Sequence, residues 1–306
     1  MKYKFILPIV FFITMVAHAQ EGYLRTQTLV RAESRQGVAP TASSVSLLVE
    51  NKVTSLVDLR AVKPSQAQVA LLIDDGLSGS AAVQLQDLRE FAQTLPTGVE
   101  LLVGYMSNGR VQIEQPFTTD HNAASSKIRI PFGSSGQSGS PYFCLSDFVK
   151  RWPIPQDGKA RFVMMITNGV DPYNGSVSIT NQNSPYVQQA ANDAMRAGVA
   201  VSSIYYRDAG FGGSAASFSG QGYLNQIADA TGGESFYEGT GNPVSFKPFL
   251  SKFIQDMGKT YVATFNALAG TGVPERLVRV KLKTSIPKLK LHYADEVMPG
   301  NVEGSE

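Results

Sequence analysis

An apolar run that ends in two carboxylates and a Gly/Ser loop occupies residues 69–80, with the sequence VALLIDDGLSGS. A short run that is apolar at every position is typical of a strand buried on both faces of a parallel sheet. Apolar residues at helical spacing follow it over residues 81–95. Ligands of open α/β sheets bind at the carboxyl ends of the strands, so the loop that begins at Asp74 is the first candidate site.

The rest of the central region repeats this alternation of strands and helices. Residues 99–106 and 110–115 flank Asn108-Gly109, a strong hairpin signal. Residues 160–166 and 199–206 are further apolar runs, and apolar positions at helical spacing mark residues 246–257. This order predicts an α/β fold, with a mostly parallel central sheet flanked by helices.

Ser-Pro pairs open two of the expected helices, at Ser140 and at Ser184. A hydroxyl cap followed by proline at the first helical position is a preferred helix start. The segment 118–130 is polar, and we expect Gly/Ser-rich loops over residues 133–139 and 208–222. A short helix over residues 223–231 and a last short strand over residues 234–237 are expected to follow.

The two flanks of this region differ from it in pattern. Residues 20–43 are predicted to form an extended arm, and residues 44–50 and 53–59 a hairpin. Strand-like runs return after residue 259. Because neither flank has enough strands to be stable alone, we expect both to combine into one small β unit. The predicted divisions are a signal peptide (1–19), an N-terminal arm and hairpin (20–66), an α/β domain (67–258) and C-terminal strands with a tail (259–306).

The first residues are typical of a secretory signal peptide. Lys2 and Lys4 precede an apolar run over residues 5–16, and Ala17-His18-Ala19 offers small residues at the cleavage positions. No later run approaches the roughly 18 apolar residues of a membrane span. No cysteine follows the apolar run as a site for lipid attachment. We therefore expect a secreted or periplasmic protein without a transmembrane segment.

Charge and cysteine content narrow the classes of function. Removing Lys2 and Lys4 leaves 25 of the 27 basic residues against 25 acidic ones, so the mature chain is formally neutral. A neutral chain argues against a nucleic-acid partner, which would require clustered excess positive charge. Cys144 is the only cysteine, which excludes an intramolecular disulfide, and its apolar neighbours indicate a buried, inert thiol.

The element order from Val69 to Gly258, with an edge hairpin after the second strand, resembles that of von Willebrand factor A (VWA) domains. The resemblance implies a metal-ion-dependent adhesion site (MIDAS) on three loops, with the patterns Asp-x-Ser-x-Ser, Thr and Thr-Asp-Gly. Such a site holds a hard cation, usually Mg²⁺, through few carboxylates, hydroxyls and waters, and leaves a position for a carboxylate of the partner.

Carried over to this chain, the resemblance places Asp74 and Ser78 in the first loop, Ser140 in the second and Asn168 in the third. Gly76 and Asn168 depart from the motif, and Asp74 supplies the only formal charge at these positions. The implied site is degraded, with weak Mg²⁺ binding at Asp74, Ser78 and Ser140 or none. In the alternative, structural interpretation, Asp74 binds loop amides, Ser140 caps a helix and Asn168 supports a turn.

The chain also resembles the secreted bacterial proteins labelled VWFA-related. The signal peptide, the IDDG sequence at residues 73–76, the segment YLNQIADATGGESFY at residues 223–237 and the terminal β stretch carry this resemblance. It implies an extracytoplasmic binding role toward an unidentified protein partner. The residues that we expect to contact the partner are Asp74, Asp75, Ser78, Ser140 and Asn168.

A serine hydrolase is the main enzymatic alternative, because Ser78 follows a strand and precedes a helix. Its surroundings miss the Gly-x-Ser-x-Gly pattern by one place, and the mature chain offers only His121 and His292 as bases. We therefore predict a non-enzymatic, VWA-type binding module that acts through the loops at the carboxyl edge of the sheet. A second alternative is a structural scaffold of an envelope assembly that docks through the flanking β unit.

Overall fold

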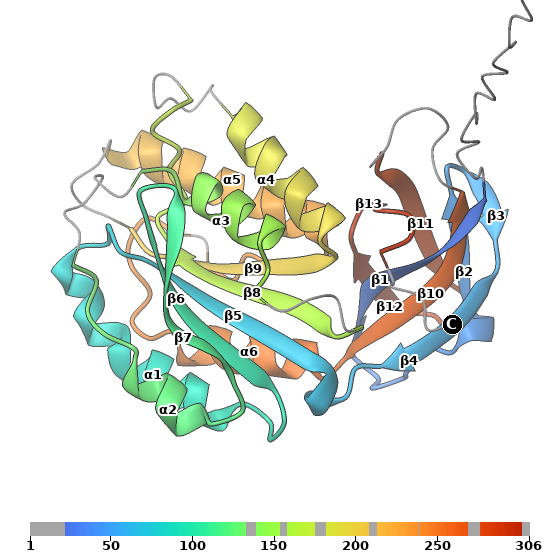
Figure 1. Ribbon diagram of the computed structural model, residues 1–306, viewed down its shortest axis with the longest axis horizontal. Coiled ribbons are helices and arrows are strands. Elements are labelled where there is room, and N and C mark those ends of the chain that lie inside the picture. The colour runs from blue at the N-terminus through green and yellow to red at the C-terminus, as the bar shows by residue number, and fades with distance from the viewer. Residues whose placement is uncertain are drawn as a thin grey trace, which may run out of the picture.

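The computed structural model describes residues 22–132, 139–153, 158–174, 182–207, 213–237, 239–268 and 276–301. An α/β domain and a β unit lie side by side, with the β unit on the right in Figure 1. The expected signal peptide lies outside the described residues, as do residues 133–138 and 208–212 of the expected Gly/Ser loops.

The α/β domain is built on a five-stranded sheet with the order β7-β6-β5-β8-β9. Its strands are β5 (Ala67–Asp74), β6 (Glu100–Ser107), β7 (Arg110–Thr118), β8 (Ala160–Thr167) and β9 (Val199–Tyr205). All neighbours pair in parallel except β6 and β7, which are antiparallel. Asn108 and Gly109 turn this hairpin with φ of 50° and 76°, as the Asn-Gly signal predicts. The predicted mostly parallel sheet is confirmed.

Helices cover both faces of this sheet (Figure 1). One face packs against α1 (Leu85–Thr94) and α6 (Lys247–Met257), and α2 (His121–Ser126) adds to the same layer. The other face packs against α3 (Pro141–Lys150), α4 (Pro185–Arg196) and α5 (Gly213–Thr231). Every residue of β5 and β8 is buried, because successive side chains of each strand enter opposite layers of the core.

The β unit consists of two four-stranded antiparallel sheets, with the orders β12-β1-β10-β4 and β13-β11-β2-β3. Its first strands are β1 (Tyr23–Ser34), β2 (Val45–Val49), β3 (Lys52–Thr54) and β4 (Leu56–Ala61). Its last strands are β10 (Thr260–Leu268), β11 (Val278–Thr284), β12 (Leu289–Tyr293) and β13 (Glu296–Val297). An apolar core of its own lies between the sheets, and the expected union of both flanks is confirmed.

The structure corrects the expectation for residues 20–43. The segment is not an arm, because its residues 23–34 form β1, which pairs with β10 along nine residues. Thr26 and Thr28 are among the inward-facing residues of β1, so the period-2 pattern of the strand is not visible as apolar alternation. The hydroxyl of Thr26 donates to the carbonyl of Leu24, which lets this polar side chain be buried.

Two further expectations need correction in the α/β domain, and one helix was not predicted. Helix α5 begins at Gly213 rather than at residue 223, so the expected loop is partly helical. The polar segment after β7 contains α2, which Asp120 caps by accepting hydrogen bonds from the amides of Asn122 and Ala123. Residues 234–237 do not form a strand but make a single parallel bridge from Ser235 to Ser203 of β9.

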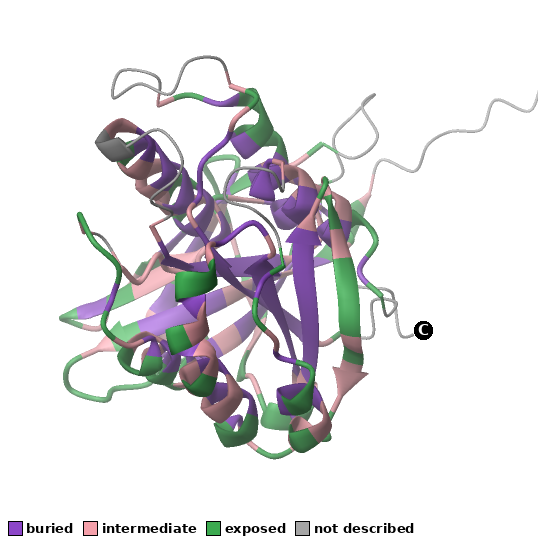
Figure 2. Cartoon of the chain, turned by 90° about the vertical axis from the view of Figure 1, so that its left-hand side faces the viewer, coloured by how far each residue is buried: buried purple, intermediate pink, exposed green. Residues whose placement is uncertain are grey.

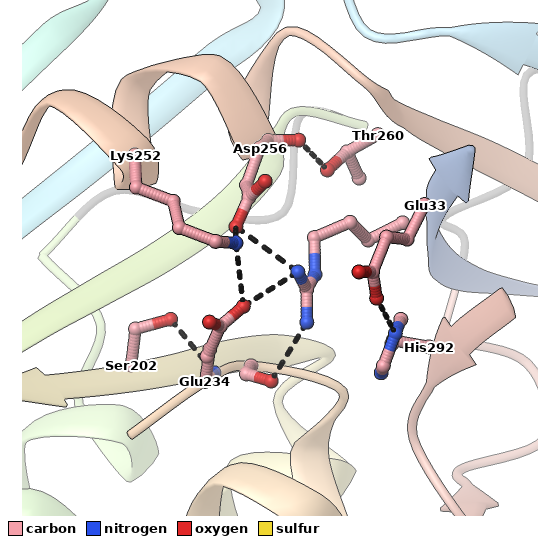
Figure 3. A network of polar contacts seen from close by, with 9 residues as sticks. Glu33, Ser202, Glu234, Lys252, Asp256, Thr260 and His292 are labelled. Atoms are coloured by element: carbon pink, nitrogen blue, oxygen red, sulfur yellow. Dashed lines mark hydrogen bonds and ion pairs between the residues drawn. The ribbon is translucent and has the colours of Figure 1, made fainter. Parts of the chain in front are cut away.

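A ring of four charges joins the β unit to the α/β domain (Figure 3). Arg31 of β1 lies 2.6 Å from a carboxylate oxygen of Glu234 and 3.0 Å from one of Asp256 on α6. Lys252 closes the ring at 3.0 Å from Glu234 and 2.7 Å from Asp256. The chain passes between the two parts twice, after β4 and before β10. These two connections lie side by side next to the ring, because the amide of Val62 donates a hydrogen bond of 2.9 Å to the carbonyl of Thr260.

Candidate functional site

Asp74 braces the loops at the carboxyl edge of the sheet. Its side chain is buried at the end of β5, where Oδ2 accepts a hydrogen bond of 2.7 Å from the hydroxyl of Thr167 at the end of β8. Its Oδ1 accepts from the amide of Gly76 at 2.9 Å. The carboxylate therefore ties two neighbouring loops together from below, as the structural interpretation of this residue predicts.

The side chain of Asp75 makes its contacts outside the sheet, with the segment that follows α2. It forms an ion pair of 2.8 Å with Arg129, and its Oδ1 also accepts from the amide of Phe132 at 2.8 Å. The Arg129 guanidinium lies 3.8 Å from the ring centroids of both Tyr105 and Phe132. Contacts of this kind between a cation and aromatic rings are favourable. They hold Phe132 in place although its surface is 77% exposed.

Ser140 starts α3 as a helix cap and is fully buried. Its Oγ accepts from the amide of Tyr142 at 3.4 Å, within the first turn. The hydroxyl of Tyr142 donates to the carbonyl of Gly169 at 2.6 Å, which ties the second loop to the third. Burial raises the pKa of Tyr142 well above its ordinary value, so the phenol remains a proton donor to that carbonyl.

The third loop is held by its own side chains. Asn168 Oδ1 accepts from the amide of Val170 at 2.9 Å, which is the turn-supporting role expected for asparagine. Buried Asp171 accepts from the amide of Tyr173 at 3.2 Å and from the hydroxyl of Ser184, the cap of α4, at 2.6 Å. Tyr173 itself points outward and is 57% exposed.

Ser78 belongs to a short chain of hydroxyl groups. Its Oγ lies 2.7 Å from Oγ of Ser80, which lies 3.0 Å from the hydroxyl of the buried Tyr206. Neither histidine of the described chain belongs to this group. His121 Nε2 contacts the carbonyl of Val99, just before the amino end of β6, and His292 pairs with Glu33 in the β unit. Among the residues that the structure describes, neither histidine is therefore placed to act as a base toward Ser78.

The oxygens at the transferred MIDAS positions do not fit a hard cation as they are arranged. Asp74, Ser140 and Asn168 each direct an oxygen at a backbone amide of their own loop, and the second oxygen of Asp74 accepts from Thr167. Within the described ranges, no group of three or more His, Cys, Asp or Glu side chains is placed to hold a metal ion. Divalent cations of this type need several oxygen ligands and gain affinity from ligand charge, and these positions carry one carboxylate.

Exposed apolar side chains surround these braced loops. Figure 2 views the molecule from the side of the carboxyl edge, where the buried strands end among exposed loops and helix ends. The exposed side chains on the segments around this edge are Val83, Ile130, Phe132, Tyr173, Tyr186, Phe218 and Val244.

The sequence resemblance to VWA domains rests on the order of strands, with one antiparallel edge strand beside the second parallel strand. The structure has this order. The α/β domain therefore has the strand order of a VWA-like fold. No family model matches the chain, and no curated protein matches it.

Three solved structures similar to this chain each have a TM-score below 0.5. A von Willebrand factor type A protein from Catenulispora acidiphila is 12% identical over 91% of this chain and 74% of its own, with a TM-score of 0.44. An aerotolerance-related membrane protein from Bacteroides fragilis is 14% identical over 63% and 99%, with a TM-score of 0.45. Manganese-loaded TRAP from Plasmodium vivax is 12% identical over 78% and 96%, with a TM-score of 0.43. The similarity concerns the course of the chain alone.

Of the five residues predicted to contact a partner, the VWA-like domain places all at its carboxyl edge, but it buries Asp74 and Ser140. The aromatic residues and Arg129 were not predicted. Arg129 lies between Ile128 and Ile130 in an otherwise polar segment. A cationic residue between two apolar ones, close in sequence to Phe132, is the signal that could have indicated a contact between Arg129 and the Phe132 ring. None of the helices in the described ranges combines the length and apolar character of a membrane span.

Proposed function

We propose that this chain is an exported, non-enzymatic binding module of the VWA type that contacts a protein partner through the loops at the carboxyl edge of its sheet. The contact surface comprises residues 74–80, 133–140 and 168–175, of which residues 133–138 and 175 lie outside the described ranges. Phe132 and the exposed apolar side chains beside these loops extend it.

The observation that carries this proposal is the support given to Phe132. An exposed phenylalanine with no binding role has no need of a fixed position. Here Asp75 binds both the Phe132 amide and the guanidinium of Arg129, which lies against the ring. Holding an aromatic side chain in place before binding reduces the entropy lost on association. Such rings are frequent among the residues that dominate binding energy.

The proposed contact does not depend on a metal ion. The polar groups of the three loops are used to hold the loops together, and the outward surface is aromatic and aliphatic. Apolar contacts of this kind retain their strength in the presence of a chelator, whereas a Mg²⁺-mediated contact would be lost.

A capture experiment with matched variants tests the proposal. The chain from residue 20 onward, immobilised, is offered an envelope and culture-fluid extract of the source organism, and bound proteins are crosslinked and identified by mass spectrometry. Phe132→Ala is expected to weaken capture of a specific protein about tenfold or more. Tyr23→Ala, which removes an equally exposed ring (73%) from the β unit, is the control and is expected to change nothing.

The scaffold alternative predicts the reverse result, and one feature of the β unit favours it. Tyr23 and Leu268 lie opposite each other on β1 and β10, and both are exposed. Loss of capture with Tyr23→Ala and unchanged capture with Phe132→Ala would reject the carboxyl-edge proposal in favour of docking through the β unit.

Export is tested separately on the full-length chain. Expression with its first residues intact should yield a processed product outside the cytosol, with Gln20 as the first residue by N-terminal sequencing. An unprocessed cytosolic product would contradict this part of the proposal.

A further inference from the structure

A cleft lies at the junction of the β unit and the α/β domain, where α4 faces β11 and β13 (Figure 1). Its volume is about 530 Å³. This volume is within the range of about 300–1,000 Å³ that is typical of small-ligand sites, which occur preferentially where two parts of a chain meet. The carboxyl-edge surface contributes no residue to the cleft, so a ligand bound here would occupy a separate site.

The segment around Asp295, which lines the cleft, is held by both parts of the chain. The amide of Asp295 donates to the carbonyl of Ala230, near the end of α5, at 3.0 Å. The amide of Val280 on β11 donates to the carbonyl of Asp295, also at 3.0 Å. Met195 of α4 and Val280 line the cleft as buried residues. The cleft is therefore formed before a ligand arrives, which reduces the cost of binding.

Four charged side chains of both signs line this cleft. Arg279 and Lys281 are two positions apart on β11, so they project from the same face of that strand. Asp295 and Glu296 supply the negative charges, and Glu296 lies opposite Arg279 in the ladder of β11 and β13. None of the four side chains forms an ion pair with another residue in the described ranges. Their charges are therefore available to a ligand.

The surroundings of these charges favour a ligand that carries both signs. The Glu50 carboxylate accepts the backbone amide of Arg279 at 2.9 Å rather than pairing with its guanidinium. Partial burial and the carboxylate of Asp229 raise the pKa of Asp295, and the charge of Arg279 offsets only part of this effect. A cationic group beside Asp295 would relieve the repulsion between the two carboxylates, and an anionic group would neutralise the β11 side.

Side-chain amides supply further polar groups of the cleft. They belong to Asn51, in the turn between β2 and β3, and to Gln188 of α4. The Asn51 side chain has no hydrogen-bond partner among the described residues. Gln188 donates to Asn192 at 3.0 Å, and its Oε1 is available as an acceptor. Because a side-chain amide offers both donors and acceptors, it complements the N–H and C=O of a peptide group.

We propose that this cleft binds a short peptide with free termini, whose carboxylate lies at Arg279 and Lys281 and whose ammonium group lies at Asp295 and Glu296. Both ends then form charge-assisted hydrogen bonds. Neighbouring strands are about 4.8 Å apart and an extended residue spans about 3.4 Å, so a peptide of about two to four residues can connect the two sides. This inference goes beyond the proposed binding of a protein partner and does not depend on it.

Isothermal titration calorimetry of the chain from residue 20 onward tests the requirement for both charges. The ligand is tetra-alanine with free termini, compared with its N-acetylated and its C-amidated forms. We expect saturable binding of the free peptide, and binding about tenfold weaker after either modification. No saturable heat with the free peptide, or equal affinity for all three peptides, would overturn the inference.

Glycerophosphocholine distinguishes a peptide from a lipid headgroup as the source of the two charges. Its quaternary ammonium group has no N–H to donate to Asp295 and Glu296, whereas the carboxylates can only accept hydrogen bonds. It should therefore bind more weakly than tetra-alanine in the same calorimetric titration. Equal or tighter binding of glycerophosphocholine would overturn the assignment to a peptide.

Two variants locate the two ends of the peptide. Lys281→Gln should weaken binding of the free peptide about tenfold, and amidation should then cost less than in the wild type, whereas acetylation should keep its full effect. In Asp295→Asn, the two modifications should exchange these effects. Lys283→Gln, which removes an exposed cation of β11 outside the cleft, is the matched control and should leave the affinity unchanged.

All three substituted side chains lie at the surface, so the variants should fold, which their melting temperatures check. If acetylation and amidation weaken binding to the same extent in the wild type and in all three variants, the peptide does not bind at these charges and the inference fails.

Discussion

Arg31 and Glu234 are 203 positions apart in sequence, yet their charged groups lie 2.6 Å apart at the junction of the β unit and the α/β domain. The Arg31 side chain is 9% exposed and also reaches Asp256. Without Arg31, the carboxylates of Glu234 and Asp256 would share the single ammonium group of Lys252. Loss of one partner from a buried charge cluster is unfavourable, so this relationship stabilises the junction of the two parts.

Arg31→Met should therefore lower the free energy of unfolding by about 2 kcal/mol, because Met keeps the apolar stem but removes the charge. The loss stays below that of a fully buried pair, since Glu234 is 30% exposed and retains Lys252. Urea unfolding measures it. Lys247→Ala, which breaks the exposed pair with Glu90, is the control and should have no measurable effect. Equal effects of the two variants would contradict the role of Arg31.

The hydrogen bond between Asp74 and Thr167 should be measurable in a double-mutant cycle. Asp74→Ala leaves a buried hydroxyl without its acceptor, so we expect a loss of about 2 kcal/mol in unfolding free energy. Thr167→Val should cost a similar amount, and the double variant less than the sum, by about 1 kcal/mol. Strictly additive losses would show that the two side chains do not brace the loops together.

Mg²⁺ should not bind appreciably to the chain. After treatment with chelator, titration with Mg²⁺ and then Mn²⁺ in a calorimeter should give no saturable heat, and the melting temperature should stay constant. The reason is the commitment of the Asp74, Ser140 and Asn168 oxygens to hydrogen bonds within the loops. Saturable binding that Asp74→Ala abolishes would show that the loops rearrange into a cation site.

Cys144 should be unreactive in the folded chain. Burial raises the pKa of its thiol to about 12, so almost no reactive thiolate exists at pH 8. A disulfide reagent such as DTNB should label the chain only in guanidinium chloride, with one thiol per chain, and Cys144→Ser provides the background. Rapid labelling of the folded chain would contradict the buried position.

Glu33 should contribute a pH-dependent part of the stability. The hydrogen bond from His292 lowers the pKa of Glu33 in the folded chain. A carboxyl group with a lowered pKa stabilises the fold above its unfolded pKa, and this stabilisation disappears as the pH falls through the folded value. The stability difference between wild type and Glu33→Gln should thus be present at pH 7 and decrease as the pH falls below the ordinary pKa of a glutamate side chain. An equal difference at all pH values in urea unfolding would contradict this contribution.

The sequence predicted the central sheet because its strands carry their own signals. The runs that became β5 and β8 are apolar at nearly every position, and a strand buried on both faces needs no distant partner to be recognised. The Asn108-Gly109 turn and the Ser140 and Ser184 caps are likewise local chemistry. These features follow from residues within a few positions of one another.

The missed elements depend on distant contacts. In β1, Thr26 and Thr28 stand among charged, polar and apolar neighbours, and its ladder partner β10 lies more than 200 positions away. The first half of α5 is rich in glycine and serine, which favour loops, but Gly220 lies so close to the Asn168 carbonyl that a side chain would not fit. Close packing against the third loop therefore overrides the local preference.

The sequence predicted at which edge of the sheet the candidate site lies, but it did not predict all of the residues found there. The carboxyl edge follows from strand direction alone, and the structural roles of Asp74, Ser140 and Asn168 follow from their residue types. The contacts among the rings of Phe143, Tyr173 and Tyr186 could not be foreseen, because these residues come from three segments that only the fold brings together.

The β unit is interrupted in sequence by the whole α/β domain, since its strands stop at Ala61 and resume at Thr260. As the chain emerges from a ribosome or a translocation pore, β1 appears long before β10, the strand that must complete its ladder. Joining the two from an unfolded chain would require closing a loop of nearly 200 residues, which is entropically unfavourable. A folded α/β domain removes this barrier, because its two ends meet where Val62 and Thr260 are hydrogen-bonded. The topology thereby sets the order of assembly. The α/β domain folds first, and its two adjacent ends bring together the strands that complete the β unit.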